Sequence, residues 1–145
     1  MKEAVGIVII AKKTNRFLLL HRASSPIVWS VLSGKMDPGE TNPYETVKRE
    51  IWEEIRINPN TIKGIRKVGS EIFKKKLFHV FVGFVEEEFE IPNLKLDEND
   101  DYGWFTENSL PKPLHKRWEK TFQLIKPILE LRESFNKNFN NLMDD

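Results

Sequence analysis

A chain of 145 residues without cysteine can bury one hydrophobic core, but it offers no disulfide framework, no thiolate metal site and no thiol nucleophile. Its 23 basic and 22 acidic residues give a net charge of +1, which draws it neither to nucleic acid nor to a membrane surface. No apolar run is long enough to span a membrane, and the early acid Glu3 is unlike a signal peptide. We expect a cytoplasmic protein with one domain over residues 1–135 and a polar, frayed C-terminal tail over residues 136–145.

The first third of the chain predicts β-strands. Residues 4–11 and 17–21 are β-rich runs, and the polar turn at residues 12–15 between them indicates a hairpin. A short run at residues 28–32 leads into a second turn, in which Pro38-Gly39 suits a positive φ at the glycine. This second turn is expected to lead from the strands into a different kind of element.

A helix is predicted after this turn, and its start is well defined. Asn42 can cap the helix, Pro43 fits its first position, and Glu45 stands where the acid of a capping box belongs. The apolar face should be formed by four residues at helical spacing: Tyr44, Val47, Ile51 and Ile55. We expect Asn58-Pro59-Asn60 to end the helix.

The second half of the chain predicts three more strands and one more helix. Strands are expected at residues 62–73, 77–85 and 102–105, the last one after an acidic loop at residues 96–101. The last helix should kink or start a new segment at Pro127. Its predicted apolar positions are Trp118, Phe122, Ile125 and Leu129. Strands mixed with two helices predict an α/β or α+β layered domain.

Four acids lie close together around the first helix. Glu50, Glu53 and Glu54 stand at i, i+3 and i+4, so their carboxylates project from one helical face. Glu40 comes from the turn before the helix. Crowded carboxylates are tolerated mainly where a cation lies between them, and hard divalent ions such as Mg²⁺ bind through carboxylates and substrate phosphates. The adjacent Arg49 can orient a carboxylate or contact a phosphate, so the cluster predicts a metal site that acts on phosphate.

The spacing of these residues resembles the Nudix box, G-x5-E-x7-R-E-U-x-E-E-x-G-U, in which U is aliphatic. The matching residues are Gly34, Glu40, Arg49, Glu50, Ile51, Glu53, Glu54 and Ile57. The resemblance implies the Nudix fold, a mixed β-sheet sandwiched between helices, and metal-dependent hydrolysis of a nucleoside diphosphate linked to another group. It implies Mg²⁺ or Mn²⁺ as the cofactor, and Arg49 as the residue that steadies the acids. The implied metal site consists of Gly34, Glu40, Glu50, Glu53 and Glu54.

The sequence departs from the box at two places. Eight residues separate Glu40 from Arg49, where the family has seven, and Arg56 occupies the place of the final glycine. The extra residue lies before the helix is capped, so the acids of the helix keep their register and only the reach of Glu40 toward the metal is affected. Without the glycine, we expect the helix terminus to shift, with Asn58-Pro59 ending the helix.

The resemblance also implies catalytic and substrate-binding residues. The catalytic set is Arg49, Glu53, Glu54 and Glu98. Family members differ in which acid is the general base, so the choice among the three acids of the helix and Glu98 stays open. Glu98 lies six residues before Trp104, a spacing that resembles members with a catalytic acid there. The candidate substrate-binding residues are Trp29, Lys35, Phe73 and Trp104, although aromatic side chains beside strands more often belong to a core.

Two basic segments allow both a functional and a structural interpretation. The lysines at residues 74–76 could contact phosphate, but a solvated turn is the favoured interpretation. The segment 115–118, His-Lys-Arg-Trp, could contact nucleic acid, but a helix packed on the sheet explains it more simply. We therefore predict no substrate contact for either segment.

The substrate predicted by elimination is a nucleoside triphosphate or a related triphosphate, cleaved to a monophosphate and pyrophosphate. Features of other subfamilies are missing; for example, Ile72-Phe73 stand where ADP-ribose hydrolases carry a proline. The segment 29–34 resembles members that act on dihydroneopterin triphosphate. The alternatives are hydrolysis of diadenosine polyphosphates, ADP-ribose or RNA 5′ ends, and a non-catalytic nucleotide-binding module. The expected partners are the nucleotide and, through edge strands, a second copy of the chain as a homodimer; neither nucleic acid nor a membrane is expected.

Overall fold

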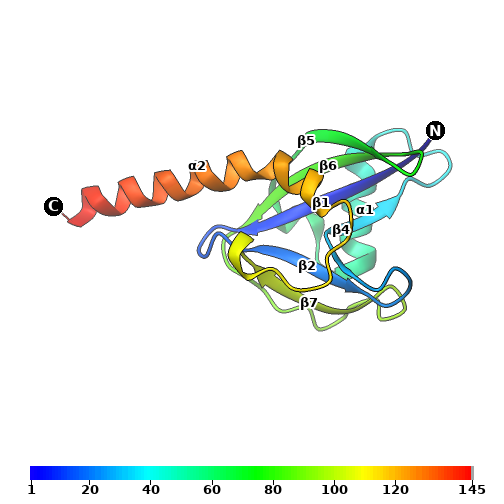
Figure 1. The fold of residues 1–145 in the computed structure, drawn as a ribbon, viewed down its shortest axis with the longest axis horizontal. Coiled ribbons are helices and arrows are strands. Elements are labelled where there is room, and N and C mark those ends of the chain that lie inside the picture. The colour runs from blue at the N-terminus through cyan, green and yellow to red at the C-terminus, as the bar shows by residue number, and fades with distance from the viewer. Residues whose placement is uncertain (145) are drawn as a thin grey trace.

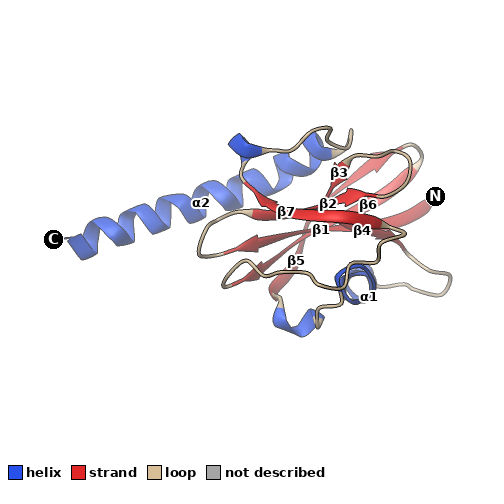
Figure 2. Ribbon diagram, turned by 90° about the horizontal axis from the view of Figure 1, so that it is seen from below, coloured by secondary structure: helices blue, strands red, loops and turns tan. Residues whose placement is uncertain are grey.

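The structure, a computed structural model, describes the backbone of residues 1–144 and the side chains of residues 1–138. A seven-stranded mixed β-sheet has α1 against one side and α2 against the other (Figure 1, Figure 2). The elements in chain order are β1 (Lys2–Ala11), β2 (Phe17–Arg22), β3 (Trp29–Ser30), β4 (Leu32–Lys35), α1 (Pro43–Ile55), the 3-10 helix η1 (Pro59–Thr61), β5 (Lys63–Phe73), β6 (Lys76–Val85), β7 (Asn99–Phe105), the 3-10 helix η2 (Glu107–Ser109) and α2 (Trp118–Asp144). The predicted α+β class, with a mixed sheet between helices, is confirmed.

Strand β1 is the centre of the sheet. One of its edges pairs in parallel with β6 along the whole strand. The other edge is shared by two antiparallel partners: β2, where Ile10 faces Phe17, and β4, which pairs with residues 4–7. β5 extends the sheet beside β6, while β3 and β7 extend it beside β2. The predicted hairpin of β1 and β2 is therefore confirmed, and β2 and β4 occupy different ends of the same edge.

Strand β1 is buried on both faces, which explains its continuous apolar run. The core on the α1 side includes Val5, Ile7, Ile9, Leu32, Val47, Ile51, Ile55 and Phe81. The core on the α2 side includes Val8, Ile10, Phe17, Leu19, Val82, Trp118, Phe122, Ile125 and Leu129. All four predicted apolar positions of α2 are confirmed. In α1 three of the four are fully buried, but Tyr44 is 38% exposed, so its predicted place in the apolar face is wrong.

Helix α1 begins as predicted and ends differently. The Asn42 side chain caps it by accepting a hydrogen bond from the backbone N–H of Tyr44 at 3.0 Å. At the other end Arg56 itself takes the left-handed conformation, with φ 55°, and donates its N–H to the carbonyl of Trp52 at 3.0 Å. The predicted shift of the terminus to Asn58-Pro59 is therefore wrong, because those residues open η1 instead. An arginine here makes the cap that a glycine makes more easily.

Helix α2 is continuous across Pro127, so the predicted new segment at that position is wrong. Its first half lies on the sheet, and its second half projects beyond it (Figure 1). Arg132 secures the helix where it leaves the sheet, by donating to the Asn15 side chain at 3.1 Å. The predicted boundary between residues 135 and 136 falls inside this helix, and fraying of the tail stays a prediction. Within residues 1–144, no helix is long and apolar enough to cross a membrane.

Candidate active site

The site begins where α1 meets the end of β4, at Gly34. A Cβ atom added to Gly34 would lie 2.0 Å from the Cδ atom of Glu50, a distance at which no side chain fits. Glycine at this position therefore lets the Glu50 carboxylate lie directly against the strand. Glu50 is only 6% exposed there. The glycine of the motif thus brings an acid of the helix to the sheet.

Arg49 holds three of the predicted acids together. Its Nε and Nη2 atoms donate to the two oxygens of Glu40, at 3.0 and 2.8 Å. Its Nη1 atom donates to Glu50 at 2.9 Å and to Glu53 at 3.0 Å, and Nη2 also donates to the carbonyl of Lys35 at 2.9 Å. The planar guanidinium suits this bidentate and branched set of bonds. Arg49 is therefore the fixed point around which the turn, β4 and α1 are arranged.

Glu40 faces Arg49 with both of its carboxylate oxygens. One of them also accepts a hydrogen bond from the backbone N–H of Asp37 at 2.6 Å. The hydrogen bond from Arg49 lowers the pKa of Glu40 to about 2. Glu40 lines a shallow hollow beside residues 35–39 and is not among the residues that line the main cavity beside Glu50. Arg49 therefore joins Glu40 to Glu50 and Glu53, but the Glu40 carboxylate faces the guanidinium and not the cavity.

Glu50 and Glu54 are buried acids with unusual protonation behaviour. Burial raises the pKa of Glu50 to about 7 despite the opposing effect of Arg49. Burial also raises the pKa of Glu54 to about 7, and the negative charges of Glu50 and Glu98 raise it further. The Asn99 side chain donates to Glu54 at 2.6 Å and fixes its orientation. Two buried carboxylates that disfavour their own charge form a place where a cation would be stabilised.

Glu50 and Glu54 line a cavity with a volume of about 710 Å³. We call Glu50, Glu53, Glu54 and Glu98 the acidic group. The same cavity is lined by lysines and arginines from several elements, and we call Arg22, Lys35, Lys74, Lys76 and Arg117 the basic group. One cavity that offers carboxylates and cations side by side can hold a divalent metal ion and a polyphosphate chain together.

The chemistry of the acidic group suits a hard divalent ion, since every side chain offers carboxylate oxygens. Within residues 1–138, however, no three His, Asp or Glu side chains already stand in a metal-binding arrangement. Glu50 and Glu53 instead accept hydrogen bonds from Arg49. A metal ion would therefore compete with the Arg49 guanidinium for these two carboxylates.

The structure brings only part of the predicted substrate-binding set to the cavity. Lys35 and Phe73 line it, whereas Trp29 and Trp104 do not. Trp29 packs edge-on against Phe105 in the core on the α2 side. The Trp104 indole donates to the carbonyl of Phe89 at 3.2 Å. Both tryptophans are thus core side chains here, and the geometry gives no support to the prediction that they stack on a substrate.

Several cavity residues were not predicted to touch a substrate. Lys74 and Lys75 form an exposed turn, as the favoured interpretation expects, but Lys74 and Lys76 also line the cavity. His115 and Arg117 line it as well, from the segment interpreted as part of a packed helix. Arg22 lines the cavity too, and no sequence pattern indicated it. The alternating pattern of β6 could have indicated that Lys76 shares a face with Phe78, but not which distant strands lie beside it.

The structure combines a mixed sheet between two helices with helix carboxylates gathered by one arginine beside a cation-lined cavity, an arrangement that suits a metal ion and a phosphate chain. Residues 1–125 match the family model described as NUDIX domain, and the chain belongs to the NUDIX family. The predicted family is therefore confirmed.

The sequence is similar to curated relatives over part of its length. Over 56 residues, 39% of this chain, it is 41% identical to the dihydroneopterin triphosphate diphosphatase of Haemophilus influenzae. The match spans only 35% of that relative. The chain therefore shares about a third of the length of this relative, which is named as a diphosphatase of a triphosphate substrate.

Solved structures share the fold across most of the chain. The dihydroneopterin triphosphate pyrophosphohydrolase of E. coli has a TM-score of 0.67 at 23% identity, covering 86% of this chain and 92% of that one. The NUDIX domain of Shewanella oneidensis NrtR, solved with ADP ribose, has a TM-score of 0.70 at 14% identity, covering 88% of this chain and 87% of that one. At these identities the likeness shows the fold.

Proposed function

We propose that this chain is a Nudix hydrolase that cleaves a triphosphate substrate, a (deoxy)nucleoside triphosphate or dihydroneopterin triphosphate, to a monophosphate and pyrophosphate with Mg²⁺ or Mn²⁺. The observation that carries the proposal is the single cavity in which the acidic group and the basic group meet. The carboxylates supply the ligands that a hard divalent ion needs, and the cations supply partners for phosphate oxygens.

The chain's own residues have separable roles in this proposal. Glu50, Glu53 and Glu54 would hold the metal ion, which when bound polarises the phosphoryl group and lowers the pKa of water. Arg49 positions Glu50 and Glu53 through its Nη1 atom. A water oxygen forms the new bond to phosphorus, the phosphoanhydride bond breaks, and pyrophosphate leaves.

Glu98 is the proposed acceptor of the water's proton. It lines the cavity with the helix acids, and its negative charge contributes to the raised pKa of Glu54. The Lys95 ammonium lies 3.6 Å from the Glu98 carboxylate and can orient it. A carboxylate near the attacking water needs the right position more than a high basicity. Glu98 comes from a loop rather than from the motif helix, so it can be tested separately from the metal ligands.

The choice of a triphosphate rests on two supports. The curated relative is named for dihydroneopterin triphosphate, although the match covers only part of both chains. In addition, the five cations of the basic group line the cavity, more than a single phosphate requires. The alternatives with ADP-ribose or diadenosine polyphosphates keep the same cleavage chemistry and differ in the group beyond the two phosphates.

The test is a substrate panel in Mg²⁺ or Mn²⁺, including nucleoside triphosphates, dihydroneopterin triphosphate, ADP-ribose and diadenosine tetraphosphate. We expect release of pyrophosphate from a triphosphate, and a loss of kcat of roughly a hundredfold or more in Glu53→Gln. Glu45→Gln is the matched control, because Glu45 is an exposed acid of the same helix outside the cavity. If no compound is cleaved, or if Glu53→Gln is as active as Glu45→Gln, the proposed function is wrong.

A further inference from the structure

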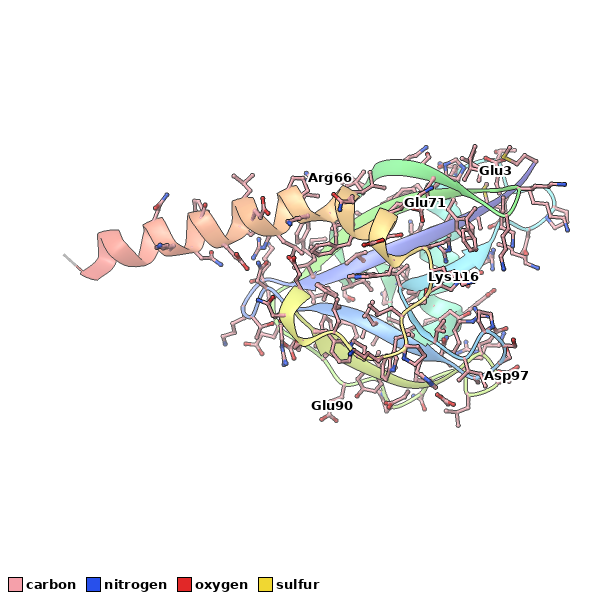
Figure 3. The ribbon with its side chains drawn as sticks, viewed as in Figure 1. Glu3, Arg66, Glu71, Glu90, Asp97 and Lys116 are labelled. Carbon is pink, nitrogen blue, oxygen red and sulfur yellow. The ribbon has the colours of Figure 1, made fainter. Side chains whose placement is uncertain are left out.

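Two lysines of the basic group, Lys35 and Lys76, lie on one face of the sheet. Lys35 of β4 pairs with Ala4 of β1, Ala4 pairs with Phe78 of β6, and Phe78 pairs with Glu71 of β5. Directly paired residues in a sheet share a face, and so do residues two positions apart. Lys76 therefore lies on the same face as Phe78. This face is the one that carries the start of α2, and Figure 3 shows Glu71 beside that part of the helix.

Arg117, the residue before α2, packs against Phe78 and Glu71 on this face of the sheet. Its Cζ atom lies 3.7 Å from the centre of the Phe78 ring, and its Nη1 atom lies 3.6 Å from the Glu71 carboxylate. Glu71 is held in turn by the hydroxyl of Thr121, which donates to it at 3.0 Å. The Arg117 side chain is only 7% exposed, and its Nε atom has no hydrogen-bond partner among the described residues. A fixed, buried cation thus forms one wall of the cavity.

The cations of this wall repel one another. Burial lowers the pKa of Lys76, and the charges of Lys35, Lys2 and Arg117 lower it further. Burial also lowers the pKa of His115 to about 4, and Arg117 adds to this effect, so His115 is neutral at pH 7. Glu71 offsets the charge of Arg117 in part, and a bound anion would relieve the remaining repulsion between Lys76 and its neighbouring cations.

We propose that Lys76 and Arg117 form an oligophosphate-binding subsite, which holds phosphate groups of the substrate that lie beyond those at the acidic group. A triphosphate chain reaches both groups, whereas a shorter chain leaves the basic group unused. These two residues then determine selectivity for chain length. The inference rests on the proposed function for its substrate and adds residues outside the motif.

Binding without a metal ion isolates this subsite from the acidic group. With EDTA present, titration calorimetry with inorganic triphosphate should show binding to the wild type that weakens with salt. Lys76→Gln should weaken it roughly ten- to a hundredfold, the usual effect of losing one charge-assisted contact. Lys67→Gln is the control, because Lys67 is an exposed lysine of the neighbouring β5 outside the cavity. Equal affinities of Lys76→Gln and the control would overturn the proposal.

Arg117 needs a variant that can still fold. Arg117→Gln alone leaves Glu71 buried without its cation, so it is paired with Glu71→Gln, which removes both charges together. Circular dichroism should show a folded protein, and its affinity for inorganic triphosphate should fall roughly tenfold or more. The single variant Glu71→Gln keeps Arg117 and should bind within roughly threefold of the wild type. If the double variant binds as tightly as Glu71→Gln, Arg117 is not part of the subsite.

Steady-state kinetics separates this inference from the proposed function. In Lys76→Gln, KM for a triphosphate should rise roughly tenfold or more while KM for ADP-ribose stays unchanged. If the wild type cleaves nothing, the proposed function fails, but metal-free binding of triphosphate still supports the subsite. If the wild type cleaves triphosphates and Lys76→Gln leaves both KM values unchanged, the subsite is wrong and the proposed function stands. A variant that weakens nucleotide but not inorganic triphosphate would mean that the wall holds a ring, which also overturns the proposal.

Discussion

The acidic group and the basic group line one cavity but are encoded in different ways. Three of the four acids lie within five consecutive residues, 50–54, so helical geometry alone puts them on one face. The basic group comes from β2, β4, the turn after β5, β6 and the segment before α2. Local spacing thus specifies the group that would bind metal, whereas long-range strand pairing assembles the group that would bind phosphate. A change at one residue should therefore affect the two groups very differently.

The largest effect is expected at Gly34, where the sheet touches the acidic group. Gly34→Ala places a methyl group about where the Glu50 carboxylate now lies, so the carboxylate must move. We expect a loss of kcat of roughly a hundredfold and a loss of stability of about 1–3 kcal/mol, measured by turnover and by urea unfolding.

Gly39→Ala is the control for this prediction. Gly39 has a positive φ of 90° but no atom within 4 Å of an added Cβ, so only its backbone is strained. Its stability should fall by about 1 kcal/mol while the turnover of the folded protein changes little. If both variants lose the same activity, the contact between Gly34 and Glu50 does not set the geometry of the acidic group.

The next effect concerns metal ions and pH. The pKa of Glu50 and of Glu54 is raised to about 7, above the ordinary value of 4.5, so without metal these groups favour the folded state below pH 4.5 and lose that contribution as pH rises through 7. Mg²⁺ should reverse the trend, because it stabilises the charged carboxylates. At a saturating concentration it should raise Tm by about 5–10 °C near pH 8 and by much less near pH 5, in thermal unfolding scans.

Glu54→Gln provides the contrast for the metal prediction. It removes one titrating carboxylate, so the metal-free protein should lose less stability between about pH 5 and pH 8 than the wild type. It should also respond less to Mg²⁺. A Tm response to Mg²⁺ that is the same in both proteins and at both pH values would show that the ion binds elsewhere.

Glu40 should behave in the opposite way with pH. Its pKa is lowered from 4.5 to about 2 by the hydrogen bond from Arg49, so its contribution to stability is present above pH 4.5 and lost as pH falls toward 2. Glu40→Gln should cost about 1 kcal/mol near pH 7 and little near pH 2, in urea unfolding at both pH values. The control is Glu45→Gln, which leaves Arg49 paired. A cost that does not depend on pH would mean that the charge of Glu40 is unimportant.

The sequence predicted the features of the fold and the site that depend on residues close together along the chain. The cap at Asn42, the register of the helix acids and the hairpin of β1 and β2 each follow from a few consecutive residues. The wall that contains Lys76 and Arg117 depends on the parallel pairing of β1 with β6, between residues more than seventy positions apart. No local pattern reports such a pairing. Trp104 shows the same limit: the sequence favours a core position for an aromatic side chain beside a strand, but only the structure shows that its partner is Phe89.

The smallest effect is expected at Arg56, where the chain departs from the family's motif. The left-handed conformation of Arg56 costs about 1–2 kcal/mol relative to glycine, and its guanidinium recovers part of this by lying over the Trp52 ring at 5.2 Å. Arg56→Gly should therefore stabilise the protein by about 0.5–1 kcal/mol, a rise in Tm of a few degrees, with unchanged kcat.

Trp52→Ala separates the cost of the left-handed backbone at Arg56 from the stabilisation by the cation–π contact. Trp52 is 49% exposed and lies outside the cavity lining, so its removal should cost little core packing while taking away the ring beneath the guanidinium. In that background Arg56→Gly should stabilise by about 0.5 kcal/mol more than in the wild type, because no cation–π contact is lost. A destabilising Arg56→Gly in both backgrounds would mean that the arginine is the better cap here. The family's glycine would then be replaceable at the end of the helix, although Gly34 at the strand would not.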